Sequence, residues 1–398
     1  MSAVTGNDVA GWTPREKQTL YAIAAAHAAS HVHILTFAPL FPLLHVELGA
    51  SFVELGLAIT LFSLTTALTQ APVGFVVDRL GARRVLTAGL VMGGIAFGSF
   101  AAFGGYAWLL IAAVLAGLAN SVYHPSDYAI LGSRIGAQRI GRAFSWHTCA
   151  GYAGGAVAPA LLLGVAAAFG VRGAVGVASL IGFAVAAYVW LACPHDEPVP
   201  KPKPGTQAAR PRILDPVIVS LTGFFVLISL SIGGLNAFSV AALVGAHGLT
   251  LGMASAALTA YLVGSASGVL IGGGLADRTS RHGLVAAAGF GLAACSTATV
   301  ALLPLPGVVV VALLGASGVL SGLCMPSRDM MVRAAAPPGQ AGATFGIVST
   351  GFNIGGIVAP LIFGWLMDHG HAGSVLLVGA GFMMITALVA AVQDLRRR

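Results

Sequence analysis

The stretch Gly74-Phe75-Val76-Val77-Asp78-Arg79 recurs in altered form as Gly273-Gly274-Leu275-Ala276-Asp277-Arg278, 199 positions later. More pairs of segments match at an offset of 201, namely His124-Pro125-Ser126 with Met325-Pro326-Ser327, Gly141-Arg142-Ala143-Phe144 with Gly342-Ala343-Thr344-Phe345, and Ala158-Pro159 with Ala359-Pro360. A fixed offset between several matched segments is the mark of an internal repeat. The chain is therefore a duplication of a unit about half its length.

The composition of this unit is that of a membrane protein. Charged residues make up 8% of the chain, against roughly 25% in soluble domains, while apolar residues reach 57% and the mean hydropathy is +0.90. Because a helix needs ~20 apolar residues to cross a bilayer, the pattern predicts twelve spans. They are residues 19–44, 52–76, 84–104, 107–132, 140–168, 172–193, 215–244, 252–275, 283–304, 307–332, 342–367 and 374–394.

The basic residues predict the orientation of these spans, since short cytoplasmic loops are rich in Lys and Arg. If both termini are cytoplasmic, all basic residues lie on the cytoplasmic side except Arg172, which lies outside, and Arg328, which lies within a span. The basic residues on the cytoplasmic side are Arg15, Lys17, Arg79, Arg83, Arg84, Arg134, Arg139, Arg142, Lys201, Lys203, Arg210, Arg212, Arg278, Arg281, Arg333 and Arg396–Arg398. We expect a multi-pass protein of the cytoplasmic (inner) membrane without a removable signal peptide. Topology explains the net charge of +7, so we expect no nucleic-acid partner.

A segment rich in Pro and charge, residues 194–213, interrupts the apolar pattern and divides the chain. Such a segment cannot span a membrane, and we interpret it as a cytoplasmic linker between bundles at 1–193 and 214–398. Because each bundle holds six spans, an even number, both enter from the cytoplasm. The predicted fold is an all-α membrane protein of two parallel six-helix repeats, an arrangement typical of secondary transporters.

The run GFVVDRLGARR, between the second and third spans, resembles the signature of the major facilitator superfamily, and GGGLADRTSRHG is its weaker copy. The resemblance covers nearly the whole chain. Within that family the chain is similar to the fosmidomycin-resistance type of exporter, through His27, APVGFVVDR and GLANSVYHPSDYA. Those exporters usually carry Asn-Asp shortly after the first-helix histidine, where this chain has Ser30-His31, so a carboxylate is missing there.

The family resemblance implies that the signature loop takes part in gating. Asp78 ends a helix, and its carboxylate can face the positive N-terminal end of a helix from the other half. The resemblance implies that Gly74, Asp78 and Arg79 stabilise one conformer; we add Arg83 and the repeat copies Asp277 and Arg278 as candidates. The alternative is a plain topology signal, because Arg after a span is expected in any case.

Ionisable residues within spans are costly and suggest a functional site. His27 and His31 share one face of the first helix, while Asn120, His124 and Asp127 share a face of the fourth. With His147 of the fifth helix, we expect His27, His124 and Asp127 to cluster in the cytoplasmic half of the first repeat. A proton site, a site for an anion or metal substrate, and a structural hydrogen bond between helices all remain open.

The second repeat offers fewer polar candidates. Arg328 aligns with Asp127 at the offset of 201, so the two could pair across the central axis; alternatively, Arg328 pairs with a nearby acid of its own half or snorkels to the interface. Asp329, in the same span, is a further polar candidate. Asn236 and Asn353 are further candidates. The glycine run GYAGGAVAPALLLG at 151–164 loosely resembles the Gly-Pro motif of proton-driven antiporters, and close helix packing is the alternative.

Together these features predict a secondary transporter that works by alternating access and exports a small organic molecule in exchange for protons. Uptake of a small organic anion such as a carboxylate is the alternative, and a non-transporting membrane scaffold or sensor is another. We expect no enzyme, because no nucleophile–base pair is apparent, and no ATP-driven pump, because no Walker loop is present. We expect no cofactor or bound metal, a small-molecule substrate, protons and the lipid bilayer as partners, and a functional monomer.

Overall fold

The computed structural model describes residues 12–136, 139–193, 215–276, 278–335 and 341–396, and every regular element in these ranges is a helix. The first half contains α1 (Pro14–Ile34), the short 3-10 helix η1 (Ala38–Leu40), α2 (Phe41–Leu48), α3 (Phe52–Leu80), α4 (Ala82–Phe103), α5 (Tyr106–Arg134) and α6 (Ile140–Ala192). The second half contains α7 (Pro216–His247), α8 (Leu251–Ala276), α9 (His282–Leu302), α10 (Gly307–Ala335), α11 (Ala341–Asp368) and α12 (Ala372–Arg396). The expected linker at 194–213 lies outside the described residues.

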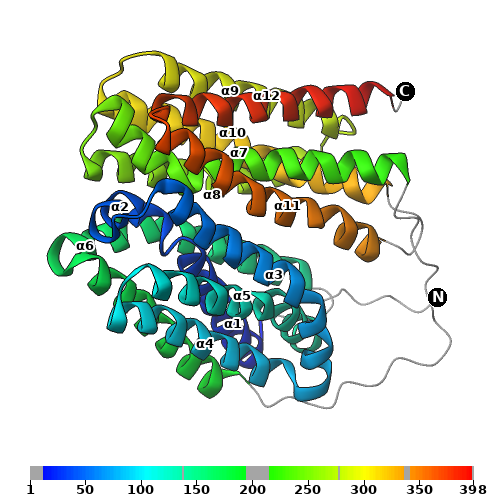
Figure 1. The fold of residues 1–398 in the computed structure, drawn as a ribbon. Coiled ribbons are helices and arrows are strands. Elements are labelled where there is room, and N and C mark those ends of the chain that lie inside the picture. The colour runs from blue at the N-terminus through cyan, green and yellow to red at the C-terminus, as the bar shows by residue number, and fades with distance from the viewer. Residues whose placement is uncertain (1–11, 137–138, 194–214, 277, 336–340, 397–398) are drawn as a thin grey trace.

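The two halves form two bundles that lie side by side, α1–α6 below and α7–α12 above in Figure 1. Helix α12 ends at the right-hand end of the bundles in that view. We call this the terminal end; α1 begins there and α12 ends there. The other end, which carries α2 and the connection from α11 to α12, is called the opposite end.

The described residues include 11 helices that are long and apolar enough to cross a membrane, and one of these, α6, is long enough for two spans. Helix α6 has 53 residues, and at 1.5 Å per residue it is roughly 80 Å long, more than twice the ~30 Å of a hydrocarbon core. At Gly170 its backbone turns to φ 71° and ψ 176°, which no helix contains and which Gly adopts readily. The kink separates the two spans expected at 140–168 and 172–193. The expected span 19–44 corresponds to α1, η1 and α2 together.

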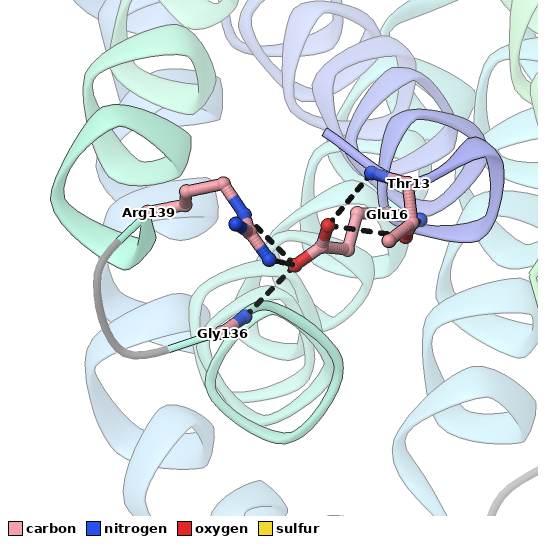
Figure 2. A network of polar contacts seen from close by, with 4 residues as sticks. All are labelled: Thr13, Glu16, Gly136 and Arg139. Atoms are coloured by element: carbon pink, nitrogen blue, oxygen red, sulfur yellow. Dashed lines mark hydrogen bonds and ion pairs between the residues drawn. The ribbon is translucent and has the colours of Figure 1, made fainter. Parts of the chain in front are cut away.

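At the terminal end, α1 is fixed to the connection between α5 and α6 by the side chain of Glu16 (Figure 2). Its Oε1 accepts hydrogen bonds from the backbone N–H of Gly136 at 3.0 Å and from Nη2 of Arg139 at 2.9 Å. Its Oε2 accepts from the backbone N–H of Thr13 at 2.9 Å, which completes a capping box at the helix start. These bonds tie α1, α5 and α6 together.

Among the described residues, the buried apolar cluster that the two bundles share lies at the opposite end. At the opposite end a single cluster of buried residues includes Phe41 and Leu55 of the first bundle together with Phe238 and Phe363 of the second. The rings of Phe41 and Phe238 lie 5.4 Å apart between centroids. Toward the terminal end each bundle has its own separate cluster. The bundles are therefore closed against each other at the opposite end.

Candidate functional site

The site is built around Asp127 of α5, whose side chain is fully buried in the first bundle. Its Oδ2 accepts a hydrogen bond from Nε2 of His147 on α6 at 2.9 Å, and Nδ1 of His27 on α1 lies 3.6 Å from the same oxygen. One carboxylate oxygen thus joins α1 to the consecutive helices α5 and α6. The cluster expected from the sequence is present.

The imidazole rings around Asp127 lie close together. The ring of His27 is stacked on that of His147, with centroids 3.7 Å apart, and lies 4.8 Å from His31 and 5.3 Å from His124. Like charges at such distances in a buried site repel strongly, so the stacked pair cannot both carry a proton at modest cost. The carboxylate and its neighbouring imidazoles can therefore share a limited number of protons.

The glycine run of α6 makes this approach possible. A Cβ atom on Gly151 would lie 2.6 Å from Cδ2 of His27 and 2.8 Å from Nε2 of His31. A Cβ on Gly154 would lie 2.2 Å from the backbone oxygen of Ala28. Small residues at this face let the backbones of α1 and α6 approach closely. In this conformation the run acts as a packing surface, which was one of its two interpretations.

The cluster retains unused bonding capacity. Among the described residues, Oδ1 of Asp127, Nδ1 of His27 and Nδ1 of His124 are buried without a hydrogen-bond partner. One donor atom each from His27, Asp127 and His147 lie within 4.8 Å of one another. Imidazole and carboxylate suit both a shuttled proton and a transition-metal ion, so the donor set leaves the metal alternative open.

The outer rim of the cluster approaches the second bundle. The ring of Tyr128 on α5 is 5.7 Å from that of His124 and 5.6 Å from that of His147, and the residue is 48% exposed. Tyr152 of α6 lies 6.4 Å from His31. Tyr128 and Tyr152 therefore form the outer rim of the cluster.

Arg328 of α10 is held within the second bundle. Its Nε and Nη2 donate hydrogen bonds to Oδ1 of Asp329 at 2.9 and 2.7 Å. Its guanidinium lies over the rings of Phe225 on α7 and Phe352 on α11, at 4.8 and 5.2 Å from their centroids, a cation–π arrangement. In this conformation Arg328 is paired within the second bundle and Asp127 is paired within the first, so the two are not paired with each other.

The three asparagines do not join the cluster. The Nδ2 of Asn120 lies 3.4 Å from the hydroxyl of Thr66, a weak contact between α5 and α3. Asn236 on α7 is half-buried, and its Oδ1 has no hydrogen-bond partner among the described residues. Asn353 is half-buried on α11. Each of them stays a prediction as a substrate-site residue.

The candidate gating residues divide into two groups. Asp78, Arg79 and Arg278 are exposed at the terminal end, and a Cβ on Gly74 would meet no atom within 4 Å. Arg83 is buried instead, with its guanidinium 4.1 Å from the ring centroid of Trp190 and hydrogen-bonded to the backbone oxygen of that residue. It therefore ties α4 to α6 within the first bundle. Asp277 lies outside the described residues.

Three residues that make contacts between helices are not among the candidates from the sequence. Tyr152 and the pair of acids Glu16 and Asp368 were not singled out. Tyr152 stands within the glycine run and breaks its small-residue pattern, which could have marked it. The two acids stand at helix ends, where acids are common, and only the contacts across the fold distinguish them.

A duplicated bundle of membrane helices with buried ionisable groups inside one repeat defines the secondary-transporter class of membrane protein. The family model of the Major Facilitator Superfamily matches residues 23–242 and residues 219–397. The chain belongs to this family of multi-pass membrane transporters, which bind small molecules within the bilayer. The repeat architecture expected from the sequence is confirmed.

The chain is also similar to individual members. It is 25% identical over 362 residues to the fosmidomycin resistance protein of Escherichia coli (strain K12), covering 88% of this chain and 86% of that one. The likeness expected from His27, APVGFVVDR and GLANSVYHPSDYA is thereby confirmed. The fold matches a bacterial homologue of the human lysosomal transporter Spinster, crystallised inward-facing and unoccupied, with a TM-score of 0.82, 15% identity and coverage of 96% and 98%. It also matches a nucleoside transporter, with a TM-score of 0.78, 13% identity and coverage of 95% and 99%.

Proposed function

We propose that this protein exports a small organic molecule across the inner membrane in exchange for protons, with both termini in the cytoplasm. The basic residues support this orientation, since they gather at the terminal end. The likeness to the fosmidomycin resistance protein supports export. With the terminal end in the cytoplasm, the closed opposite end faces outward, and the conformation corresponds to an inward-facing state.

The observation that carries proton coupling is the contact of Asp127 with His147 and His27 in a site without exposure to water. A carboxylate buried in a membrane domain is expensive as an isolated charge. It is tolerated when neutral or when a neighbouring imidazole holds a proton. Loading and release of that proton would change the charge beside Tyr128 and Tyr152, where a substrate between the bundles would lie.

Uptake of a small organic anion is the second candidate, with Arg328 as counter-charge. The two hydrogen bonds from Arg328 to Asp329 disfavour it, because an anion would have to displace the carboxylate that already neutralises the guanidinium. A scaffold without transport would have no need of a buried acid among four histidines. We therefore favour export, by a monomer, as in the ordinary major facilitator arrangement.

Proteoliposomes loaded with a compound panel that includes fosmidomycin and small carboxylates test the proposal. We expect at least one organic compound to move against its own gradient when an opposing proton gradient is imposed, and to stop when a protonophore is added. Proton-coupled movement of a carboxylate in the same direction as the proton would instead support uptake. Transport of no compound, in protein shown to be folded, would contradict both.

A further inference from the structure

The bundles are joined at the opposite end by a carboxylate that binds the start of a helix. Asp368 is the last residue of α11 in the second bundle, and α3 of the first bundle begins at Phe52. The Oδ1 of Asp368 accepts a hydrogen bond from the backbone N–H of Phe52 at 2.6 Å, and its Oδ2 accepts from that of Val53 at 2.8 Å. One side chain therefore spans the junction between the bundles with both of its oxygens.

The start of α3 is incomplete without this contact. The first N–H groups of a helix have no partner within the helix. In α3 the N–H of Glu54 donates to Oγ of Ser51, and the N–H of Ser51 donates to Oε2 of Glu54, which forms a capping box. The capping box leaves the N–H groups of Phe52 and Val53 without a partner in the first bundle, and these two groups donate hydrogen bonds to Asp368. The second bundle thus completes the cap of a helix in the first.

The position of Asp368 also disfavours any local role. The C-terminal end of a helix carries a partial negative charge, so an acid there is destabilised by its own helix and stabilised by the N-terminus of another. The surroundings hold the two helices in close contact. A Cβ on Gly56 would lie 2.5 Å from the backbone oxygen of Pro360, and a Cβ on Gly364 would lie 2.7 Å from that of Phe52. Separation of α3 from α11 at this end would break both bonds of Asp368.

We propose that Asp368 is the gating residue of the opposite end, and that it acts reciprocally with Asp78. Asp78 lies near the end of α3, and α11 begins at Ala341 at the same, terminal end. Each of these two helices thus carries an acid near its end and offers an N-terminus to the other. Asp368 holds α3 while the opposite end is closed, and Asp78 is exposed. When the bundles change to the other conformer, the hydrogen bonds from α3 to Asp368 break and Asp78 binds the backbone N–H groups at the start of α11. The inference rests on the proposed alternating access, but not on any particular substrate.

Distances between spin labels on full-length protein in lipid nanodiscs test the gate without a substrate. In a background with the native cysteines replaced, labels at Val46→Cys and Leu303→Cys report the opposite end, and labels at Arg142→Cys and Arg333→Cys report the terminal end. Asp368→Asn should open the opposite end, so the long-distance population of its label pair should rise several-fold. The terminal end should close at the same time, so the short-distance population of its label pair should also rise. Asp78→Asn should shift both in the other direction, and the double variant should lie between them.

Glu54→Gln is the matched control, because it removes a charge from the same helix start while glutamine keeps the capping box. It should leave the distances unchanged. Val53→Pro removes one donor from the partner side, at a position where a helix tolerates proline, and should shift the populations in the direction of Asp368→Asn. If neither Asp368→Asn nor Val53→Pro shifts the populations, the proposal is wrong, even if transport is observed. A shift without transport of any compound would support the gate and contradict the proposed function.

Discussion

Asp127 accepts a hydrogen bond from His147 at 2.9 Å within the first bundle, where both side chains are almost completely buried. The bond joins α5 to α6, and His27 of α1 stacks on the same imidazole. Three helices of one repeat thus meet at one carboxylate. A change in the charge of this carboxylate should therefore alter the contacts among these three helices.

Asp127→Asn should abolish accumulation of substrate driven by a proton gradient. Asparagine has nearly the shape of aspartate but cannot exchange a proton, so exchange of substrate across the membrane without a gradient should persist. Both assays are made on the same proteoliposomes. His371→Gln, at an exposed site at the opposite end, is the control and should retain gradient-driven transport. Full accumulation by Asp127→Asn would exclude this residue as the proton carrier.

Asp78→Asn should slow transport without weakening the fold. Asp78 is exposed in this conformation, so its loss should change the free energy of unfolding by less than about 0.5 kcal/mol, as at other surface sites. Its proposed partner, the start of α11, is engaged only in the other conformer. The initial transport rate and the thermal unfolding temperature are measured together, with Glu47→Gln as an exposed control. A normal rate in well-folded Asp78→Asn protein would contradict the gating role.

Asp127 and Arg328 should form a charge pair at the terminal end when that end closes. In the present conformation each has other partners, His147 and Asp329 respectively. Asp127→Ala should then favour the inward-facing state, and the exchange of Asp127→Arg with Arg328→Asp should restore part of the balance. Labelling of single cysteines at the two ends measures the shift. If labelling is unchanged in Asp127→Ala, or is not restored in the charge exchange, the predicted pair does not form and Arg328 interacts with its local partners only.

Gly154→Ala should destabilise the first bundle by about 1–3 kcal/mol, the usual cost of overpacking a filled interior. The added methyl group would lie 2.2 Å from the backbone oxygen of Ala28, so α1 and α6 would have to separate. Gly164→Ala, on the same helix and with no atom within 4 Å, is the control and should be neutral or slightly stabilising. Thermal unfolding of both variants in detergent compares them. Equal stability would mean that the α1–α6 contact is not tight.

Much of the site followed from periodicity. Residues three, four and seven apart share a helix face, so Asn120, His124 and Asp127 could be aligned without a structure. Periodicity carries no information about rotation of one helix relative to another. The sequence therefore left open whether Asp127 pairs with His147 or with Arg328, and whether Arg83 faces the other bundle.

The sequence by itself determined the duplication and the spans, because hydropathy and repeats are properties of the chain read in order; their orientation is a prediction from the loop charges. Even the division of α6 at Gly170 fell between two predicted spans. Only the tertiary structure decided that His27 and His147 stack, that Gly151 and Gly154 make room for α1, and that Asp368 reaches the start of α3. These contacts join residues more than a hundred positions apart, and their geometry depends on how the helices pack rather than on the pattern within any one of them.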